Sequence, residues 1–153
     1  MKRFILPLFF LLFAACDSRR IYDTFSPISN TQGWEYDQTM QFEVPISDTS
    51  KLYNIYINLR HANSFPYSNL WVKVNTTFPS GKKMESRVNL PLADKSGKWY
   101  GNGSGDVITA QIPIQENAKM PENGNYRLAL TQDMRVNPLK DLLDIGIRVE
   151  TTE

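Results

Sequence analysis

The fold of this chain is decided by the stretch Tyr53-Asn54-Ile55-Tyr56-Ile57-Asn58-Leu59-Arg60. Apolar or aromatic side chains at the odd positions alternate with mostly polar ones, which is the period of a β-strand that buries one face. The same period recurs in six more runs, at residues 40–46, 70–78, 88–92, 108–114, 126–130 and 143–149. Since no segment has a convincing period of 3.6 residues, the pattern predicts an all-β protein.

Short clusters of turn-forming residues separate these runs, at residues 79–81, 94–97, 101–105 and 122–124. Seven runs at this spacing, with an eighth candidate at residues 98–101, predict a single antiparallel β-sandwich or jelly-roll-like domain. The glycine-rich segment 101–105 is predicted to be a flexible turn or a bulge, because a phosphate cradle needs a helix behind it and a strand follows instead. One short helical turn is expected at residues 137–143, where Pro138 can take the first helical position.

Three prolines fall inside strand-like runs: Pro45, Pro91 and Pro113. Proline has no N–H to donate to a neighbouring strand. We therefore expect these strands to lie at sheet edges or to carry bulges, where proline also discourages aggregation through the edge.

The N-terminus has the features of a bacterial lipoprotein signal peptide. Lys2 and Arg3 precede an apolar run, residues 4–15, which is too short to cross a bilayer and ends in two alanines before Cys16. The segment resembles a lipobox, whose cysteine sulfur receives a diacylglyceryl group before the signal is removed and the new N-terminus is acylated. We predict lipidation at Cys16; the alternative is a stray or buried thiol in an ordinary secretory signal.

The predicted organisation has three parts: residues 1–15 form the signal peptide, 16–38 the lipid anchor and tether, and 39–153 the β-sandwich. Cys16 is the only cysteine, so a lipidated chain keeps no thiol for a disulfide. Loss of Lys2 and Arg3 with the signal changes the formal net charge from +1 to −1. A balance so near zero gives no electrostatic reason to expect nucleic acid as a partner, or a polybasic surface that binds a membrane.

Motifs for catalysis and metal binding are missing from the sequence. His61 is the only histidine, and we expect it to form hydrogen bonds at a strand end. A glycosidase needs two carboxylates across a cleft, and the spacing of the acidic residues does not indicate such a pair. The acidic residues considered are Asp94, Asp106, Asp133, Asp141 and Asp144. These observations predict a protein that is not an enzyme and that holds no cofactor and no metal.

Several aromatic side chains are candidates for a binding platform. They are Trp99 and Tyr100 beside the glycine-rich segment, Trp71 and Tyr56 at outward strand positions, and Tyr67 in a loop. Together they could hold a sugar ring or a protein partner. The alternative is that loops cover the second face of a sheet and bury these rings.

The combination resembles the gliding-motility lipoprotein GldH family. The segments that carry the resemblance are Asn58-Leu59-Arg60, Tyr67-Ser68-Asn69-Leu70, Leu92-Ala93-Asp94, residues 97–105, Gln132-Asp133-Met134-Arg135 and residues 142–150. Each segment is weak alone, but their order, the size of the chain and the lipobox make the match fairly specific.

The resemblance implies a non-enzymatic lipoprotein of the cell envelope, an accessory or scaffold component of the machinery that moves surface adhesins and is coupled to type IX secretion. It implies partners among the envelope proteins of that machinery and a lipid anchor in the outer membrane, facing the periplasm. We predict a partner-binding surface with contributions from Trp99, Tyr100, Arg135, Asp144 and Arg148. The alternative is that the two arginines only form surface ion pairs with Asp144 or Asp133.

A second hypothesis is a carbohydrate-binding lipoprotein of the surface or periplasm that uses Trp99 and Tyr100, and a weaker third is a glycosidase. The motif Asp48-Thr49-Ser50 also resembles the pattern at which this bacterial group attaches O-linked glycans. A plain turn between strands explains that motif equally well.

Overall fold

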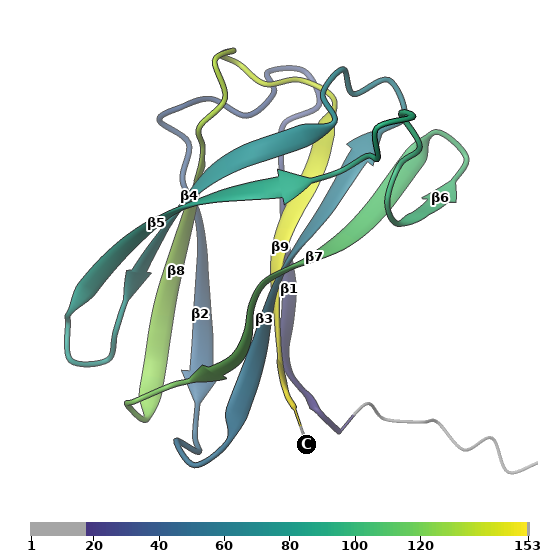
Figure 1. Ribbon diagram of the computed structural model, residues 1–153. Helices are drawn as coiled ribbons and strands as arrows, with labels where there is room; N and C mark the ends of the chain where they lie inside the picture. The colour runs from purple at the N-terminus through teal and green to yellow at the C-terminus, as the bar shows by residue number, and fades with distance from the viewer. Residues whose placement is uncertain (1–17, 153) are drawn as a thin grey trace, which may run out of the picture.

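Nine strands form two antiparallel sheets within residues 18–152, the part of the chain that the computed structural model describes (Figure 1). The strands are β1 (Arg20–Pro27), β2 (Met40–Ile46), β3 (Leu52–Ala62), β4 (Asn69–Thr77), β5 (Lys83–Pro91), β6 (Asn102–Ser104), β7 (Val107–Lys119), β8 (Gly124–Gln132) and β9 (Leu142–Thr151). One sheet has the order β1-β9-β3-β7-β6 and the other has the order β2-β8-β4-β5. The prediction of an all-β sandwich is confirmed. Residues 18–152 contain no helix long and apolar enough to span a membrane.

The inner faces of the two sheets form the core, and the alternation in the sequence places them there. On β2 every second side chain is buried, from Met40 to Ile46, and β3 buries Tyr53, Ile57 and Leu59 in the same way. Burial of apolar surface contributes about 25 cal/mol per Å² to the free energy of folding, so these inner faces are the main source of stability.

The prolines lie where the sequence analysis expects them. Pro45 is on β2 and Pro91 is on β5, the two edges of the four-stranded sheet. Pro113 is on β7 beyond the three residues that pair with β6, beside a register irregularity opposite Ile55 and Tyr56. None of these positions requires the missing N–H.

The folded domain begins at Arg20 rather than at residue 39, so the prediction that residues 16–38 form a tether is wrong for most of that segment. Arg20–Pro27 forms β1 and pairs with β9 along its length. The following loop places Trp34 in the core with no exposed surface, and the Trp34 indole Nε1 donates to the Gln38 carbonyl oxygen at 2.8 Å. Cys16 and the predicted signal peptide lie outside the described residues.

Three local expectations need correction. The predicted helical turn at residues 137–143 is absent, because the Leu139 backbone exchanges two hydrogen bonds with Trp34 in an isolated bridge. Residues 98–101 form no strand beyond a single bridge between Trp99 and Ala93, and the short β6 follows them. In β9 a register shift opposite Arg60 and His61 buries Leu142 instead of Leu143.

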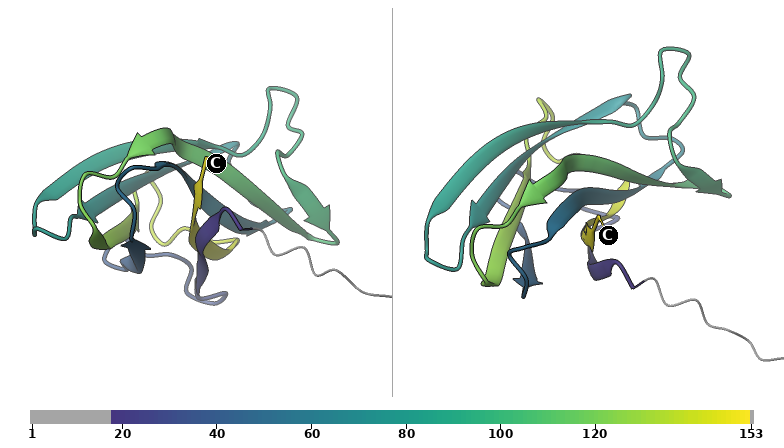
Figure 2. Two further views of the ribbon diagram at one scale, coloured as in Figure 1. Left: turned by 90° about the horizontal axis from the view of Figure 1, so that it is seen from below. Right: turned by 60° about the horizontal axis from the view of Figure 1, so that its bottom comes forward.

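The sandwich has two ends that differ in their connections (Figure 1). The tether end holds Arg19, the turns 47–51, 78–82 and 120–123, and Thr152. The far end holds the loops 28–39, 63–68, 92–101 and 133–141. Figure 2, which views the molecule from below, brings the tether end and the C-terminus toward the reader.

Candidate partner-binding surface

A surface hollow of about 400 Å³ lies on the outer side of the four-stranded sheet, next to the far end. We call it the Trp71 hollow; it is lined by Tyr67, Trp71, Arg87, Asp133, Met134, Arg135 and Val136. These residues come from β4, β5 and the loops 63–68 and 133–141. Trp71 takes an outward position on β4 because the alternation turns Leu70 and Val72 into the core.

Asp133 organises the charged side of the hollow. Its carboxylate pairs with the Arg87 guanidinium and lies 3.5 Å from the Lys73 ammonium nitrogen. The hydrogen bond from Arg87, with help from Lys73, lowers the pKa of Asp133 below its usual value. The Arg87 guanidinium lies 4.0 Å from the centre of the Trp71 ring, a cation–π contact that covers one face of the indole.

The loop that follows Asp133 is held from both sides. The buried Gln132 side chain donates to the Val136 carbonyl oxygen at 3.0 Å and accepts from the Met134 N–H at 2.9 Å. From the outside, the Tyr36 hydroxyl donates to the Met134 carbonyl oxygen at 2.8 Å. A surface that is pre-ordered in this way loses little conformational entropy when a partner binds.

Two exposed side chains complete the Trp71 hollow. Arg135 is exposed and has no ion-pair partner among residues 18–152, and Val136 is 43% exposed. Tyr36 adds a further exposed ring beside the same loop. Tryptophan, tyrosine, methionine and arginine are the residues enriched in protein interfaces. The composition of the hollow therefore suits a protein partner.

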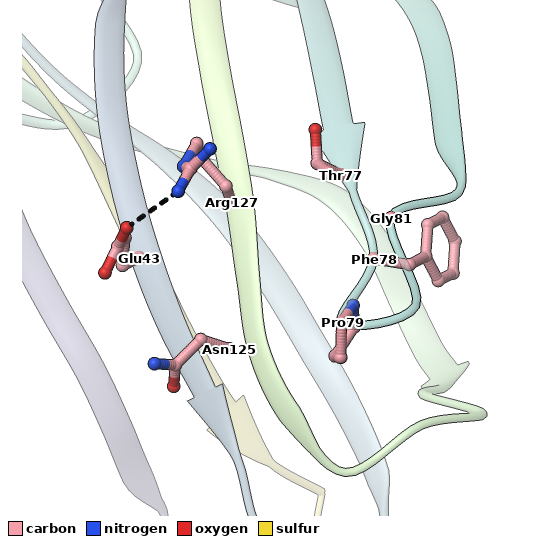
Figure 3. A pocket seen from close by; sticks show the side chains of 7 residues that line it. All are labelled: Glu43, Thr77, Phe78, Pro79, Gly81, Asn125 and Arg127. Carbon is pink, nitrogen blue, oxygen red and sulfur yellow. Dashed lines mark hydrogen bonds and ion pairs between the residues drawn. The ribbon is translucent and has the colours of Figure 1, made fainter.

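A second hollow of about 310 Å³ lies at the tether end of the same sheet, between β2, β8 and the turn 78–82 (Figure 3). Glu43 and Arg127 form an ion pair of 3.3 Å across it, with both side chains more than half exposed. The Phe78 ring points away from these two residues (Figure 3). An exposed ion pair of this kind contributes at most about 1 kcal/mol. Because the Phe78 ring is directed away from the pair, no large apolar side chain lies beside it to anchor a partner.

Trp99 and Tyr100 do not line the Trp71 hollow; they belong to the loop 92–101. Trp99 is half-buried, packs edge-on against His61 with 4.6 Å between ring centres, and donates from Nε1 to Asn63 Oδ1 at 2.8 Å. Tyr100 is 49% exposed. The structure therefore does not assemble the aromatic platform that the sequence suggested.

His61 itself is fully buried, and its Nδ1 lies 2.9 Å from the Ala62 carbonyl oxygen near the end of β3. This agrees with the expected role as a hydrogen-bonding residue at a strand end. Burial lowers the pKa of His61.

Asp144 and Arg148 lie on the outer face of the five-stranded sheet, on β9. The Arg60 guanidinium binds Asp144 through Nε at 2.8 Å and Nη2 at 2.5 Å. Arg148 pairs with Asp23 at 3.2 Å and with Glu150 at 2.8 Å. Arg148 therefore forms ion pairs within the domain, as the alternative supposed, but with Asp23 and Glu150 in place of Asp144 or Asp133. The alternative does not describe Arg135, which has no ion-pair partner among residues 18–152.

The remaining predicted residues are also spread over the molecule. The Tyr56 hydroxyl donates to Glu150 at 2.9 Å. Tyr56 is on the five-stranded sheet, whereas Trp71 is on the four-stranded sheet. Thr49 is exposed in the turn 47–51, where the Asp48 carboxylate accepts from the Ser50 N–H. Within residues 18–152 no cluster of three histidine, cysteine, aspartate or glutamate side chains is arranged to hold a metal ion.

Fold and surface together define a class of protein: a small antiparallel β-sandwich that carries a pre-ordered hollow, a candidate for binding a partner, near one end. The chain belongs to the GldH lipoprotein family, whose model matches residues 20–149. It is 33% identical over 150 residues to the gliding motility lipoprotein GldH homolog of Christiangramia forsetii, covering 94% of this chain and 91% of that one. It is 29% identical over 153 residues to gliding motility lipoprotein GldH of Flavobacterium johnsoniae, covering 95% and 94%. The resemblance stated from the sequence is confirmed, and membership implies a membrane-anchored location in the cell envelope.

Solved structures give weaker likenesses. A carbohydrate-binding module specific for non-crystalline cellulose matches with a TM-score of 0.42 and 7% identity, over 84% of this chain and 73% of that one. An exo-beta-1,3-galactanase from Phanerochaete chrysosporium matches with a TM-score of 0.38 and 15% identity, over 86% and 26%. Scores of this size carry no argument about ligand or activity.

Proposed function

We propose that the protein is a non-enzymatic accessory or scaffold subunit of the gliding-motility machinery and of the type IX secretion system coupled to it. The names of the two relatives support the motility part of this proposal. The observation that carries the scaffold part is the Trp71 hollow, because it combines aromatic, methionine and arginine side chains on a loop held by Gln132 and Tyr36. Its partner is an envelope protein of the same machinery.

The experiment is crosslinking in native membranes followed by purification of the tagged protein. We expect Trp71→Ala and Arg135→Ala to lose a co-purifying envelope protein that the wild type retains. Arg127→Ala is the matched control, because Arg127 is an equally superficial arginine in the other hollow. Stable, abundant Trp71 and Arg135 variants that keep the partner and fully restore a deletion strain would contradict the proposal.

The lipid at Cys16 anchors the chain in the outer membrane, with the domain in the periplasm. The sequence around Cys16 supports this part, together with membership of a lipoprotein family. Metabolic labelling with an alkyne analogue of palmitate tests it: the wild type should be labelled and Cys16→Ser should not. Equal labelling of both proteins would contradict lipidation at Cys16.

The carbohydrate-binding alternative finds little support in the aromatic residues. Arg87 covers one face of Trp71, and Trp99 is packed on His61 with its N–H occupied. Sugar rings bind to open aromatic faces, and Tyr100 is the most exposed of these rings. A glycan array on which binding disappears with Trp99→Ala would nevertheless favour this alternative over the scaffold.

A further inference from the structure

We propose that β5 is an interface between two copies of this protein. It pairs in antiparallel orientation with β5 of a second copy, which joins the two four-stranded sheets into one continuous sheet. This pairing goes beyond the proposed function and does not depend on which envelope protein occupies the Trp71 hollow.

β5 is an edge strand that lacks the features by which the other edges avoid pairing. Prolines, irregular register and very short strands are such features. β2 carries Pro45, β6 has three residues, and β1 has a register irregularity at its start. β5 instead pairs with β4 over its full length without irregularity, and its proline, Pro91, is its last residue. The other side of β5 is therefore open to a further strand.

The inner side of β5 is left partly uncovered by the five-stranded sheet. Met84 is 48% exposed although it lies on this side. Met84, Ser86 and Val88 line a small hollow of about 70 Å³ together with Ile114 of β7. A strand added beside β5 would place further side chains on this apolar margin and remove Met84 from water.

The side chains of β5 favour a second copy as that strand. Glu85 is exposed and has no ion-pair partner among residues 18–152. A two-fold axis at Ser86 places Glu85 of each copy opposite Arg87 of the other, on the outer face. On the inner face the same axis places Met84 opposite Val88. An axis moved by one residue, to Glu85 or to Arg87, would place like charges opposite each other, which is destabilising.

This symmetry arranges the Trp71 hollows of the two copies on one face. The two-fold axis is perpendicular to the sheet, so the outer faces of both four-stranded sheets point in the same direction. Each hollow includes Arg87 of its own β5 and therefore lies beside the interface. Both five-stranded sheets, in which the chains begin with β1, lie on the opposite face. The dimer presents two binding surfaces together, which increases the avidity for a partner that has two matching sites.

Disulfide trapping of the full-length protein in intact cells tests the pairing. Ser86→Cys places two cysteines at the axis, where opposite Cβ atoms are about 4.5–5.5 Å apart, close to the spacing of a disulfide. Ser50→Cys is the matched control, because Ser50 is also exposed but lies in the turn 47–51, which follows β2 at the other edge of the same sheet. The unaltered chain measures any background from Cys16. After mild oxidation, the disulfide-linked dimer is quantified by non-reducing electrophoresis and immunoblotting.

We expect at least about fivefold more dimer from Ser86→Cys than from Ser50→Cys, because only position 86 lies at the axis. Adding Glu85→Lys should reduce the dimer to the level of Ser50→Cys, whereas Glu43→Lys, the same change of charge on β2, should leave it unchanged. Equal trapping at positions 86 and 50, or trapping that survives Glu85→Lys, would overturn the pairing. A disulfide that joins position 86 to a different protein would overturn the second copy as the occupant of this edge.

Discussion

The two ends of this sandwich use their connections differently. The tether-end turns 47–51, 78–82 and 120–123 contribute one residue to the buried hydrophobic core, Met120. The far-end loops contribute Ile28, Trp34, Phe65, Leu92 and Leu139. The far-end loops are therefore part of the core, and this packing helps to hold the surface that they carry. The tether-end turns are short and mostly exposed, and two of them carry an exposed lysine, Lys51 and Lys82.

Trp34→Ala should have the largest effect on stability. The indole has no exposed surface and its N–H is bonded within its own loop, so its removal leaves a large cavity at the far end. We expect a loss of about 3–5 kcal/mol in the free energy of unfolding, measured by urea denaturation of the acyl-free chain from Ser18. Phe78→Ala at the tether end, where the ring is half-buried, should cost clearly less. Equal losses would show that the far-end loops are not core.

Glycine substitution sharpens the same contrast. Gly101 and Gly81 both have positive φ, at 98° and 88°, but a Cβ on Gly101 would lie 2.2 Å from the Thr109 carbonyl oxygen whereas Gly81 has open space. We expect Gly101→Ala to cost about 2–4 kcal/mol, from backbone strain plus the clash, and Gly81→Ala about 1 kcal/mol from strain alone. Chemical denaturation compares the two. Similar values would mean that the loop 92–101 moves freely to make room.

His61 should make the far end sensitive to pH. Burial lowers the pKa of His61 below its ordinary value of 6.5, so the folded protein keeps the ring neutral while the unfolded chain binds a proton. The unfolded state therefore gains stability as the pH falls below about 6.5, and the folded state loses up to about 1.4 kcal/mol per pH unit until the ring is protonated in the fold as well. Urea midpoints at pH 7.5 and 5.5 measure this loss. In His61→Gln the loss should shrink, and an unchanged loss would assign it to other groups.

Arg87→Ala should have the smallest effect on stability and a large effect on binding. The arginine is about half exposed, and its contacts with Asp133 and Trp71 are surface contacts that contribute at most about 1 kcal/mol. Thermal unfolding should therefore change by only a few degrees. Capture of the envelope partner should nevertheless fall, since the variant removes a cation that covers Trp71. Full capture would exclude this side of the hollow from the interface.

The alternation of apolar and polar residues correctly predicts the strands that bury one face. It does not predict a strand whose side chains are mostly exposed. β1 contains Arg20-Ile21-Tyr22-Asp23-Thr24, in which no period of two is visible, because this edge strand is fixed by pairing with β9 rather than by core side chains. The alternation predicts that Leu143 is buried, whereas the structure buries Leu142, because a bulge in β9 shifts the alternation by one residue and leaves no mark in the sequence pattern.

The candidate site was only partly predictable for a different reason. Arg135, Trp71 and Tyr67 were singled out separately, but the Trp71 hollow joins residues that are up to about seventy positions apart. Only the pairing of β4 with β5 and β8 brings them together. Trp34 offers one usable signal, a large aromatic directly after Gly33 in a mostly polar segment, but a segment without periodicity predicts a tether.

In-cell photocrosslinking from the two ends tests the central claim most directly. A photoreactive amino acid replaces Val136 beside the Trp71 hollow or Ser80 in the tether-end turn 78–82, both exposed. We predict a discrete protein adduct from position 136 that disappears when Arg135→Ala is added, and no adduct with a different protein from position 80. Protein adducts from position 80 with none from position 136 would contradict the assignment of partner binding to the Trp71 hollow.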